Sequence, residues 1–155
     1  RKIMGYQFKL TEEKDQPVLS IRTRAAASEL PRECGRVYGQ LAQYLEEVEE
    51  KTEGPAFVAY YNMDMEDLDV EIGLLVPKSI PGKGAILGTK IPEGKQVSCM
   101  HKGSYGEVGP AYDALAAWAG EQSLTPTGIS YEFYYNSPGE VPESELMTKI
   151  IFPVK

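Results

Sequence analysis

The chain has 155 residues, which fits one domain or two very small ones. Hydrophobic residues make up 42% of it and charged residues 25%, an ordinary globular mixture that argues against disorder. The net charge of −7 without a basic block argues against direct DNA binding, because affinity for nucleic acid comes from Lys and Arg against phosphate.

In the first half, the pattern predicts strand, helix, strand, strand. A short β-branched run after Pro17 predicts a strand over Val18–Arg24. Apolar residues recur at helical spacing from Leu30 to Val48, where a helix is expected. Strands are then predicted over Phe57–Asn62 and Val70–Val76.

A linker over 78–84 follows, and we expect Ala85–Ile91 to form a hairpin with the next strand. The second half repeats the order of the first. The predicted ranges are a strand at 96–102, a helix at 110–122, and strands at 130–136 and 147–154.

The two halves also align residue by residue. Val37–Tyr44 matches Ala111–Trp118 at an offset of 74 (112 − 38), and the same offset superimposes two Tyr-Tyr-Asn triplets, Tyr60–Asn62 and Tyr134–Asn136. Val70–Leu74 matches Thr148–Phe152 at an offset of 78 (148 − 70). The sequence therefore predicts an internal duplication, with repeats at about 5–77 and 84–155 in a single domain over 1–155.

The expected fold class is α+β, a tandem duplicated βαββ repeat. Each repeat has one helix, which covers one face of its sheet. We therefore expect two antiparallel sheets with the helices outside and a central ligand cleft, because ligand sites often lie between halves.

Glu132 is the residue that departs most from the pattern of its strand. It shares one strand face with Ser130 and Tyr134, whereas its equivalent in the first half is Val58. A carboxylate among aromatic residues either has a raised pKa or awaits a cationic partner. The alternative interpretation is a solvated face, on which Glu132 has no role.

Tyrosine is unusually frequent, with ten Tyr in the chain. A Tyr ring offers an apolar body, a π face that attracts cations and a hydroxyl group. Tyrosines around one carboxylate would suit planar, lipophilic cations. The alternative is that most of them, Tyr44 and Tyr61 for instance, are packing residues.

Other chemical signals are weaker. Cys99 and His101 share a strand face and form a conceivable nucleophile and base, although a buried Cys is commonly a small hydrophobe. The acidic run from Asp64 to Asp69 resembles a calcium loop only loosely, and an exposed loop is the preferred interpretation.

No metal site and no cofactor are predicted, because the chain has a single His and no P-loop spacing around Gly82–Gly84. Two cysteines are too few for a secreted disulfide scaffold, so a cytoplasmic protein is expected. No apolar run is long enough to span a membrane, and residues 1–5 show no signal peptide, so no membrane partner is expected.

Taken in order, several stretches resemble the GyrI-like family, which includes effector-binding domains of AraC-type and MerR-type multidrug-responsive activators. The resemblance covers about Gly5 to Val154. It rests on these stretches: His101–Glu107, Gly128, the Tyr-Glu-x-Tyr strand Tyr131–Tyr134, Ile150–Val154 and Asp67–Gly73.

The resemblance implies a central cleft in which a buried glutamate, ringed by aromatics, receives lipophilic cations. Glu132 stands at that position, and Tyr134 and Tyr105 are expected to line the pocket. Strand and helix phase add these lining residues: Trp118, Tyr60, Tyr38 and Tyr112, the helix equivalent of Tyr38.

One departure concerns Lys149, where family members often carry an acidic residue; a Lys149 side chain facing Glu132 would compete with cations. No helix-turn-helix precedes the repeats, so a stand-alone domain is expected rather than a transcription factor.

The leading functional hypothesis is a protein that binds and sequesters planar hydrophobic, often cationic, small molecules. A first alternative is a hydrolase of cyclopropane-type alkylating toxins, with Glu132 and Tyr105 as catalytic residues. A second is a gyrase-inhibitor-like module that binds a protein partner through its acidic surface.

Overall fold

A computed structural model describes residues 5–155, and these form two compact units that are described separately. Unit 1 contains the chain up to Glu13 together with Gly94–Lys155, and unit 2 contains Lys14–Glu93. Residues 1–4, part of the stretch in which no signal peptide is expected, lie outside the described residues. Within 5–155, no helix is both long enough and apolar enough to cross a membrane.

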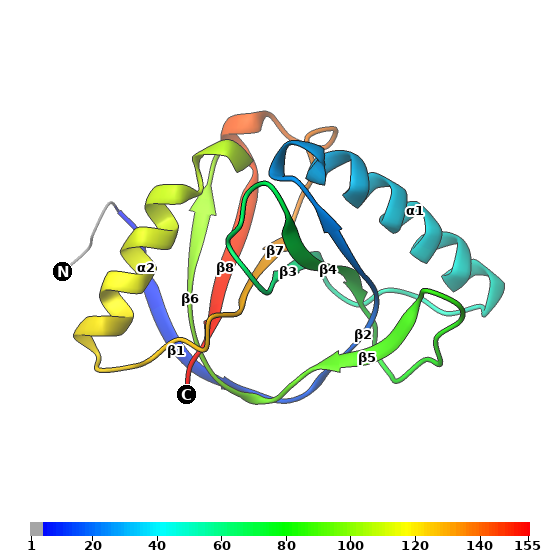
Figure 1. Cartoon of the computed structure of the whole chain (residues 1–155), viewed down its shortest axis with the longest axis horizontal. Helices are drawn as coiled ribbons and strands as arrows, with labels where there is room; N and C mark the ends of the chain where they lie inside the picture. Colours follow the sequence, from blue (N-terminus) through cyan, green and yellow to red (C-terminus); the bar gives the residue numbers. More distant parts are fainter. Residues whose placement is uncertain (1–4) are drawn as a thin grey trace. The chain divides into compact units, whose positions relative to one another are not determined.

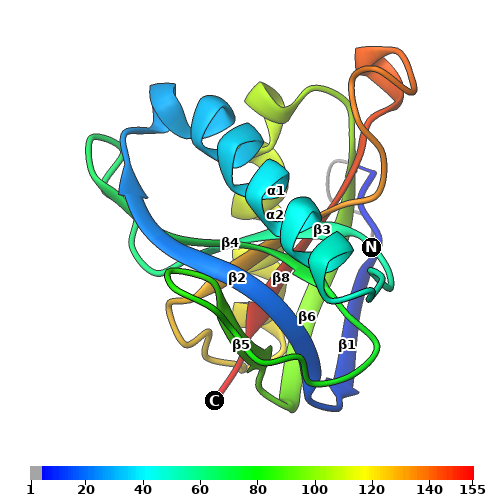
Figure 2. The ribbon, with the colours of Figure 1, turned by 90° about the vertical axis from the view of Figure 1, so that its right-hand side faces the viewer.

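Unit 2 is a four-stranded antiparallel sheet with one helix (Figures 1 and 2). The strands lie in the order β5-β2-β4-β3. Their bounds, and that of the helix, are β2 (Gln16–Ala25), α1 (Leu30–Glu47), β3 (Ala56–Tyr60), β4 (Leu68–Leu75) and β5 (Leu87–Ile91).

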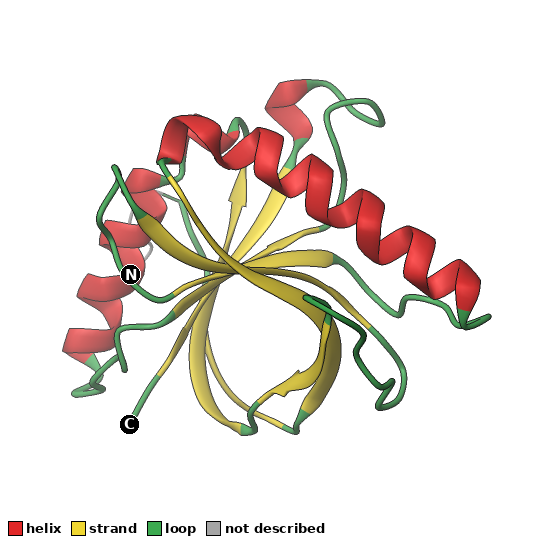
Figure 3. Cartoon of the chain, turned by 45° about the vertical axis from the view of Figure 1, so that its right-hand side comes forward, coloured by secondary structure: helices red, strands yellow, loops and turns green. Residues whose placement is uncertain are grey.

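Unit 1 likewise consists of one helix and four antiparallel strands, here in the order β1-β6-β8-β7 (Figure 1). Figure 3 shows the helices in red and the strands in yellow. Its elements are β1 (Phe8–Glu13), β6 (Gly94–Lys102), the short 3₁₀ helix η2 (Tyr105–Glu107), α2 (Gly109–Glu121), β7 (Ser130–Tyr134) and β8 (Met147–Pro153).

Each helix buries its apolar side. Val37, Leu41 and Leu45 of α1 are buried, as the helical spacing predicts. In unit 1, Ala111 and Leu115 of α2 form one core with sheet residues that include Val97, Cys99, Ile150 and Phe152. Burial of such side chains is the main stabilising contribution to a core of this kind.

The register of the strands confirms the duplication. Leu19 pairs with Leu74 in unit 2, and Val97 pairs with Phe152 in unit 1, so both partners move by 78 positions (97 − 19 and 152 − 74). Each unit therefore contains the predicted strand, helix, strand, strand, with one further strand at the edge of its sheet. The tandem βαββ fold class is confirmed at the level of each unit, whereas the central cleft stays a prediction.

Two features differ from expectation. The strand at Leu87–Ile91 does not form a hairpin with the strand that follows it but pairs with β2. The turn lies before this strand rather than after it. Two glycines, Gly82 and Gly88, allow the backbone to approach itself closely there, since a Cβ at Gly88 would lie 2.0 Å from the Ile80 carbonyl oxygen. The second difference is β1, which was not predicted. Because β1 pairs with β6, the chain up to Glu13 belongs to unit 1, and the bounds of the compact units therefore differ from the predicted repeats at about 5–77 and 84–155.

Candidate functional site

Glu132 lies on the helix-covered face of the unit 1 sheet. It pairs in register with Ile150, and paired residues of neighbouring strands share a face. Ile150 belongs to the core beneath α2, so the carboxylate lies on the same side. Only 7% of Glu132 is exposed, and the solvated-face interpretation is therefore wrong.

Two tyrosine hydroxyls hold this carboxylate. Tyr112 of α2 donates a hydrogen bond of 2.5 Å to Oε2, and Tyr134 of β7 donates one of 2.8 Å to Oε1. Both oxygens of Glu132 thus accept a hydrogen bond from a neutral group. No ion pair of the described residues includes Glu132, so its charge has no basic partner within 4 Å.

Burial raises the pKa of Glu132 above its ordinary value, because removal from water disfavours the charged form. The hydrogen bonds from Tyr112 and Tyr134 oppose this shift, as does the charge of His101. The raised pKa means that the cost of burial outweighs the stabilisation these neighbours give the ion. A buried carboxylate with a perturbed pKa is a typical feature of a functional site.

His101 of β6 and Tyr105 of the segment after it lie near this group. The buried His101 and the carbonyl oxygen of Ser104 are 2.9 Å apart; since a carbonyl only accepts, Nε2 carries the proton. Tyr105 is 38% exposed, donates to the carbonyl of Asn136 at 3.3 Å, and meets the ring of Tyr134 edge-on with centroids 5.4 Å apart. Tyr105 is therefore linked to Glu132 indirectly, by its ring contact with Tyr134, whose hydroxyl binds the carboxylate.

Lys149 lies on the other face of the sheet. It pairs with Phe133 and Met100, whereas the next residue, Ile150, shares the face of Glu132. The side chains of successive strand residues point to opposite faces. Lys149 therefore does not stand beside the carboxylate within unit 1.

The other predicted lining residues are placed differently. Trp118 of α2 stacks on Phe8 of β1, with ring centroids 5.4 Å apart, at the edge of the unit 1 core. Tyr38 and Tyr60 belong to unit 2, where the Tyr38 hydroxyl donates to the carbonyl of Phe57 at 3.1 Å. Tyr44 is a packing residue as expected, being buried with its hydroxyl on the Pro81 carbonyl.

The structure argues against the thiol chemistry considered for Cys99 and His101. Burial raises the pKa of the Cys99 thiol to about 11, so the nucleophilic thiolate is scarce near neutral pH. The sulfur lies 3.9 Å from the carbonyl oxygen of Ala111, inside the core. Cys99 behaves as a small core residue.

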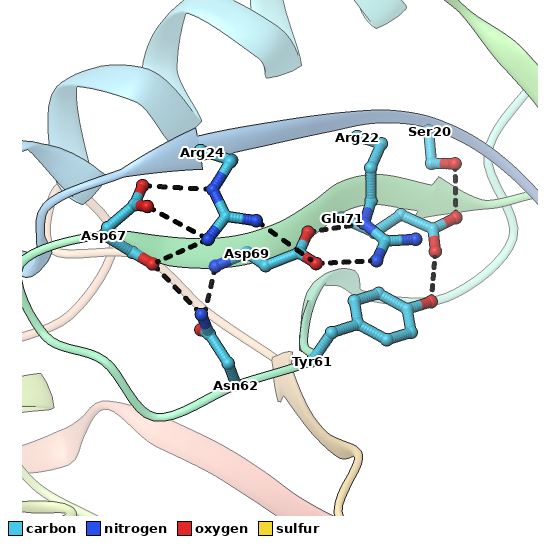
Figure 4. A network of polar contacts seen from close by, with 8 residues as sticks. All are labelled: Ser20, Arg22, Arg24, Tyr61, Asn62, Asp67, Asp69 and Glu71. Atoms are coloured by element: carbon cyan, nitrogen blue, oxygen red, sulfur yellow. Dashed lines mark hydrogen bonds and ion pairs between the residues drawn. The ribbon is translucent and has the colours of Figure 1, made fainter.

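The acidic run in unit 2 is part of a polar network on the sheet (Figure 4). Asp69 accepts two hydrogen bonds from Arg22, and Asp67 accepts from Arg24. Glu71 accepts from Ser20 at 2.5 Å and from Tyr61 at 2.6 Å. These carboxylates are engaged by arginine and hydroxyl groups, and no group of metal-ligating side chains occurs in residues 5–155.

Thr148 of β8, which is absent from the residues predicted for the site, is fully buried on the same face as Glu132. The signal was available in the duplication, since its equivalent in the first half is Val70. Unit 1 thus carries polar residues at two positions, 132 and 148, where unit 2 carries buried valines.

The GyrI-like small molecule binding domain family matches residues 6–155, and the chain belongs to this family. No curated protein matches the chain.

Three proteins of known structure share the fold. The EcmrR chain in a cryo-EM structure of an EcmrR–DNA complex is 25% identical in sequence to this chain, with a TM-score of 0.84. The match covers 99% of this chain and 59% of the EcmrR chain, so this chain spans less than two thirds of EcmrR. The EcmrR C-terminal domain alone is 24% identical, with a TM-score of 0.79 over 98% of this chain and 99% of that one. A hydrolase from Listeria innocua is 11% identical (TM-score 0.74, 96% and 92%), as is SAV2435 bound to tetraphenylphosphonium (TM-score 0.63, 96% and 94%).

Proposed function

We propose that this protein binds and sequesters hydrophobic, ring-bearing cations, planar dyes among them, with Glu132 as the group that receives their charge. The observation that carries the proposal is a buried carboxylate that two tyrosine hydroxyls hold and that forms no ion pair with any residue of 5–155. A buried charge of this kind is costly, and a desolvated cation among aromatic rings would offset the cost.

The contacts around Glu132 support three of the proposed lining residues. Tyr112 and Tyr134 touch the carboxylate, and Tyr105 meets Tyr134 edge-on. Lipophilic cations suit the apolar rings, and SAV2435 of the same fold is bound to one, tetraphenylphosphonium. Trp118, Tyr38 and Tyr60 stay predictions as further lining residues. Cytoplasmic sequestration is part of the proposal, supported by a content of only two cysteines, Cys34 and Cys99, too few for a secreted disulfide scaffold.

The test is a titration of the purified protein with rhodamine 6G and with a neutral dye of matched size. Wild type is expected to bind the cation at micromolar levels and the neutral dye more weakly. Glu132→Gln keeps the shape of the side chain and removes the charge, and is expected to weaken cation binding at least about tenfold, or about 1.4 kcal/mol. Equal cation affinity in the two proteins would overturn the role of Glu132.

A hydrolase is the second candidate, since a structural neighbour is a hydrolase and a carboxylate of raised pKa can act as a general base. In that case Glu132 would activate water, and Tyr105 would polarise the strained substrate. Turnover of a cyclopropane-bearing alkylating agent, lost in Glu132→Gln while binding is largely kept, would favour this function over sequestration.

A further inference from the structure

The hydroxyl group of Thr148 is a buried polar group that none of the described residues satisfies by a hydrogen bond. Thr148 has no exposed surface, and within residues 5–155 its Oγ1 has no hydrogen-bond partner. Native proteins leave few buried polar atoms without a partner, because each such atom loses its hydrogen bond to water and gains nothing. This hydroxyl therefore calls for a specific explanation.

Its position ties it to the Glu132 site. Thr148 pairs in register with Tyr134 on one side and with His101 on the other, so the three residues form one row across β7, β8 and β6. Residues in register share a face, and neighbouring strands lie about 4.8 Å apart. Thr148 is thus about one strand spacing from the strand that carries Glu132, on the same helix-covered face.

Within this row, the proton of the Thr148 hydroxyl is the one without an acceptor. The Tyr134 hydroxyl donates to Glu132, and His101 Nε2 donates to the Ser104 carbonyl. The Thr148 hydroxyl could donate to a group that arrives with a ligand.

The duplication shows that the fold does not need a hydroxyl at this position. The equivalent of Thr148 in unit 2 is Val70, which is fully buried and pairs with Tyr60, the equivalent of Tyr134. Val has the shape of Thr without the hydroxyl. The polar atom in unit 1 is therefore an addition to a position that packs well with Val.

We propose that Thr148 is a specificity-determining residue, which donates a hydrogen bond to an acceptor on the bound cation. The ligand class is then a lipophilic cation that also carries a hydroxyl, ether or carbonyl oxygen as a hydrogen-bond acceptor. This inference rests on the proposed function and adds to it a second point of recognition beside Glu132.

Two cations of one shape test the inference by isothermal titration calorimetry: (3-hydroxypropyl)triphenylphosphonium and butyltriphenylphosphonium, which differ by a hydroxyl in place of a methyl group. Wild type is expected to bind the hydroxyl-bearing cation about five- to tenfold more tightly. Thr148→Val is expected to abolish this preference and to leave the affinity for the butyl cation unchanged.

Thr11→Val is the matched control. The Thr11 hydroxyl of β1 is also buried without a partner among the described residues, but Thr11 pairs with Gln96, on the sheet face opposite to Val97 and Glu132. Its substitution is expected to change neither affinity. A wild type that does not prefer the hydroxyl-bearing cation, or a Thr148→Val protein that keeps the preference, would overturn the inference.

Glu132→Gln separates the two proposals. If it weakens both cations while Thr148→Val leaves the preference intact, the proposed function stands and the role of Thr148 is wrong. If wild type binds neither cation, or Glu132→Gln changes neither affinity, the proposed function itself fails. An equal loss for both cations in Thr148→Val would indicate a packing effect and would also overturn the inference.

Discussion

Tyr112 and Glu132 are joined by a hydrogen bond of 2.5 Å that links α2 to β7 within unit 1. The equivalent tyrosine of unit 2, Tyr38, donates to the backbone carbonyl of Phe57 at 3.1 Å, where Val58 replaces the glutamate. The tyrosine at this helix position thus donates to a side-chain carboxylate in one repeat and to a backbone carbonyl in the other.

Tyr112→Phe is expected to raise the pKa of Glu132 further. The variant removes one of two hydroxyls that stabilise the ionised carboxylate, and a hydrogen bond to a charged group is worth about 1.5–3 kcal/mol. The measurement is an NMR titration of the Glu132 side-chain carboxyl carbon in wild type and variant.

Tyr38→Phe is the control for that experiment, because it removes the equivalent hydroxyl from a neutral acceptor. It is expected to lower the free energy of unfolding by about 0.5–1.5 kcal/mol and to leave the Glu132 titration in place. A Glu132 pKa that is the same in wild type and in Tyr112→Phe would contradict the assigned role of the hydrogen bond.

Stability should depend on pH through Glu132 in a defined direction. Because its folded pKa is raised above the ordinary 4.5, the folded state holds the proton at pH values where the unfolded state has lost it. Stability from this group is therefore fully present below the ordinary pKa and falls as pH rises towards the folded pKa, by at most about 1.4 kcal/mol per pH unit.

Glu132→Gln isolates this effect, since the other carboxylates are common to both proteins. The free energy of unfolding of the variant minus that of wild type is expected to increase with pH above 4.5 and to level off above the folded pKa. Urea unfolding at a series of pH values gives the difference. A constant difference, or one that decreases with pH, would show that the pKa of Glu132 is not raised.

The sequence was sufficient to predict the repeated βαββ order and to single out Glu132, because both depend on periodicity and on comparison of the two halves. It left open whether Glu132 is buried or lies on a solvated face. It was not sufficient for the pairing of Leu87–Ile91, which depends on the close backbone approach at Gly82 and Gly88 rather than on any alternation of side chains. β1 escaped prediction for a related reason: its alternation is weak, since it lies at the edge of its sheet.

Individual contacts at the site could not be predicted either. Helix phase placed Tyr112 among the candidates, but not its hydroxyl on Glu132. The face of Lys149 required the register of β7 and β8, which a one-residue slip would reverse. Thr148 is easily overlooked in the sequence because Thr is common in strands. Its burial, its lack of a partner among the described residues and its replacement by Val70 in the first half together distinguish it.

The two cysteines are expected to differ in reactivity. Cys34 on α1 is partly exposed, whereas Cys99 is buried and its thiol pKa is raised to about 11. In native buffer at pH 8, 5,5′-dithiobis(2-nitrobenzoic acid) should modify Cys34 alone, and Cys34→Ser should react only after unfolding in urea. Rapid labelling of native Cys34→Ser would show that the Cys99 thiol is accessible and reactive, which would support a thiol-based function for Cys99.

Gly73 of β4 is expected to tolerate no side chain. A Cβ there would lie 2.6 Å from the ring of Phe57 and 2.7 Å from the backbone oxygen of Leu19, and neither neighbour is the end of a flexible chain. Gly73→Ala should therefore lower the free energy of unfolding by about 1–3 kcal/mol through overpacking.

Gly39→Ala is the matched control, since Gly39 lies inside α1 and a Cβ added to it would meet no described atom within 4 Å. That substitution should raise stability by up to about 1 kcal/mol, because Ala has the higher helix propensity. Urea unfolding of the three proteins decides, and a Gly73→Ala protein as stable as wild type would show that β4 and Phe57 pack less closely than the structure indicates.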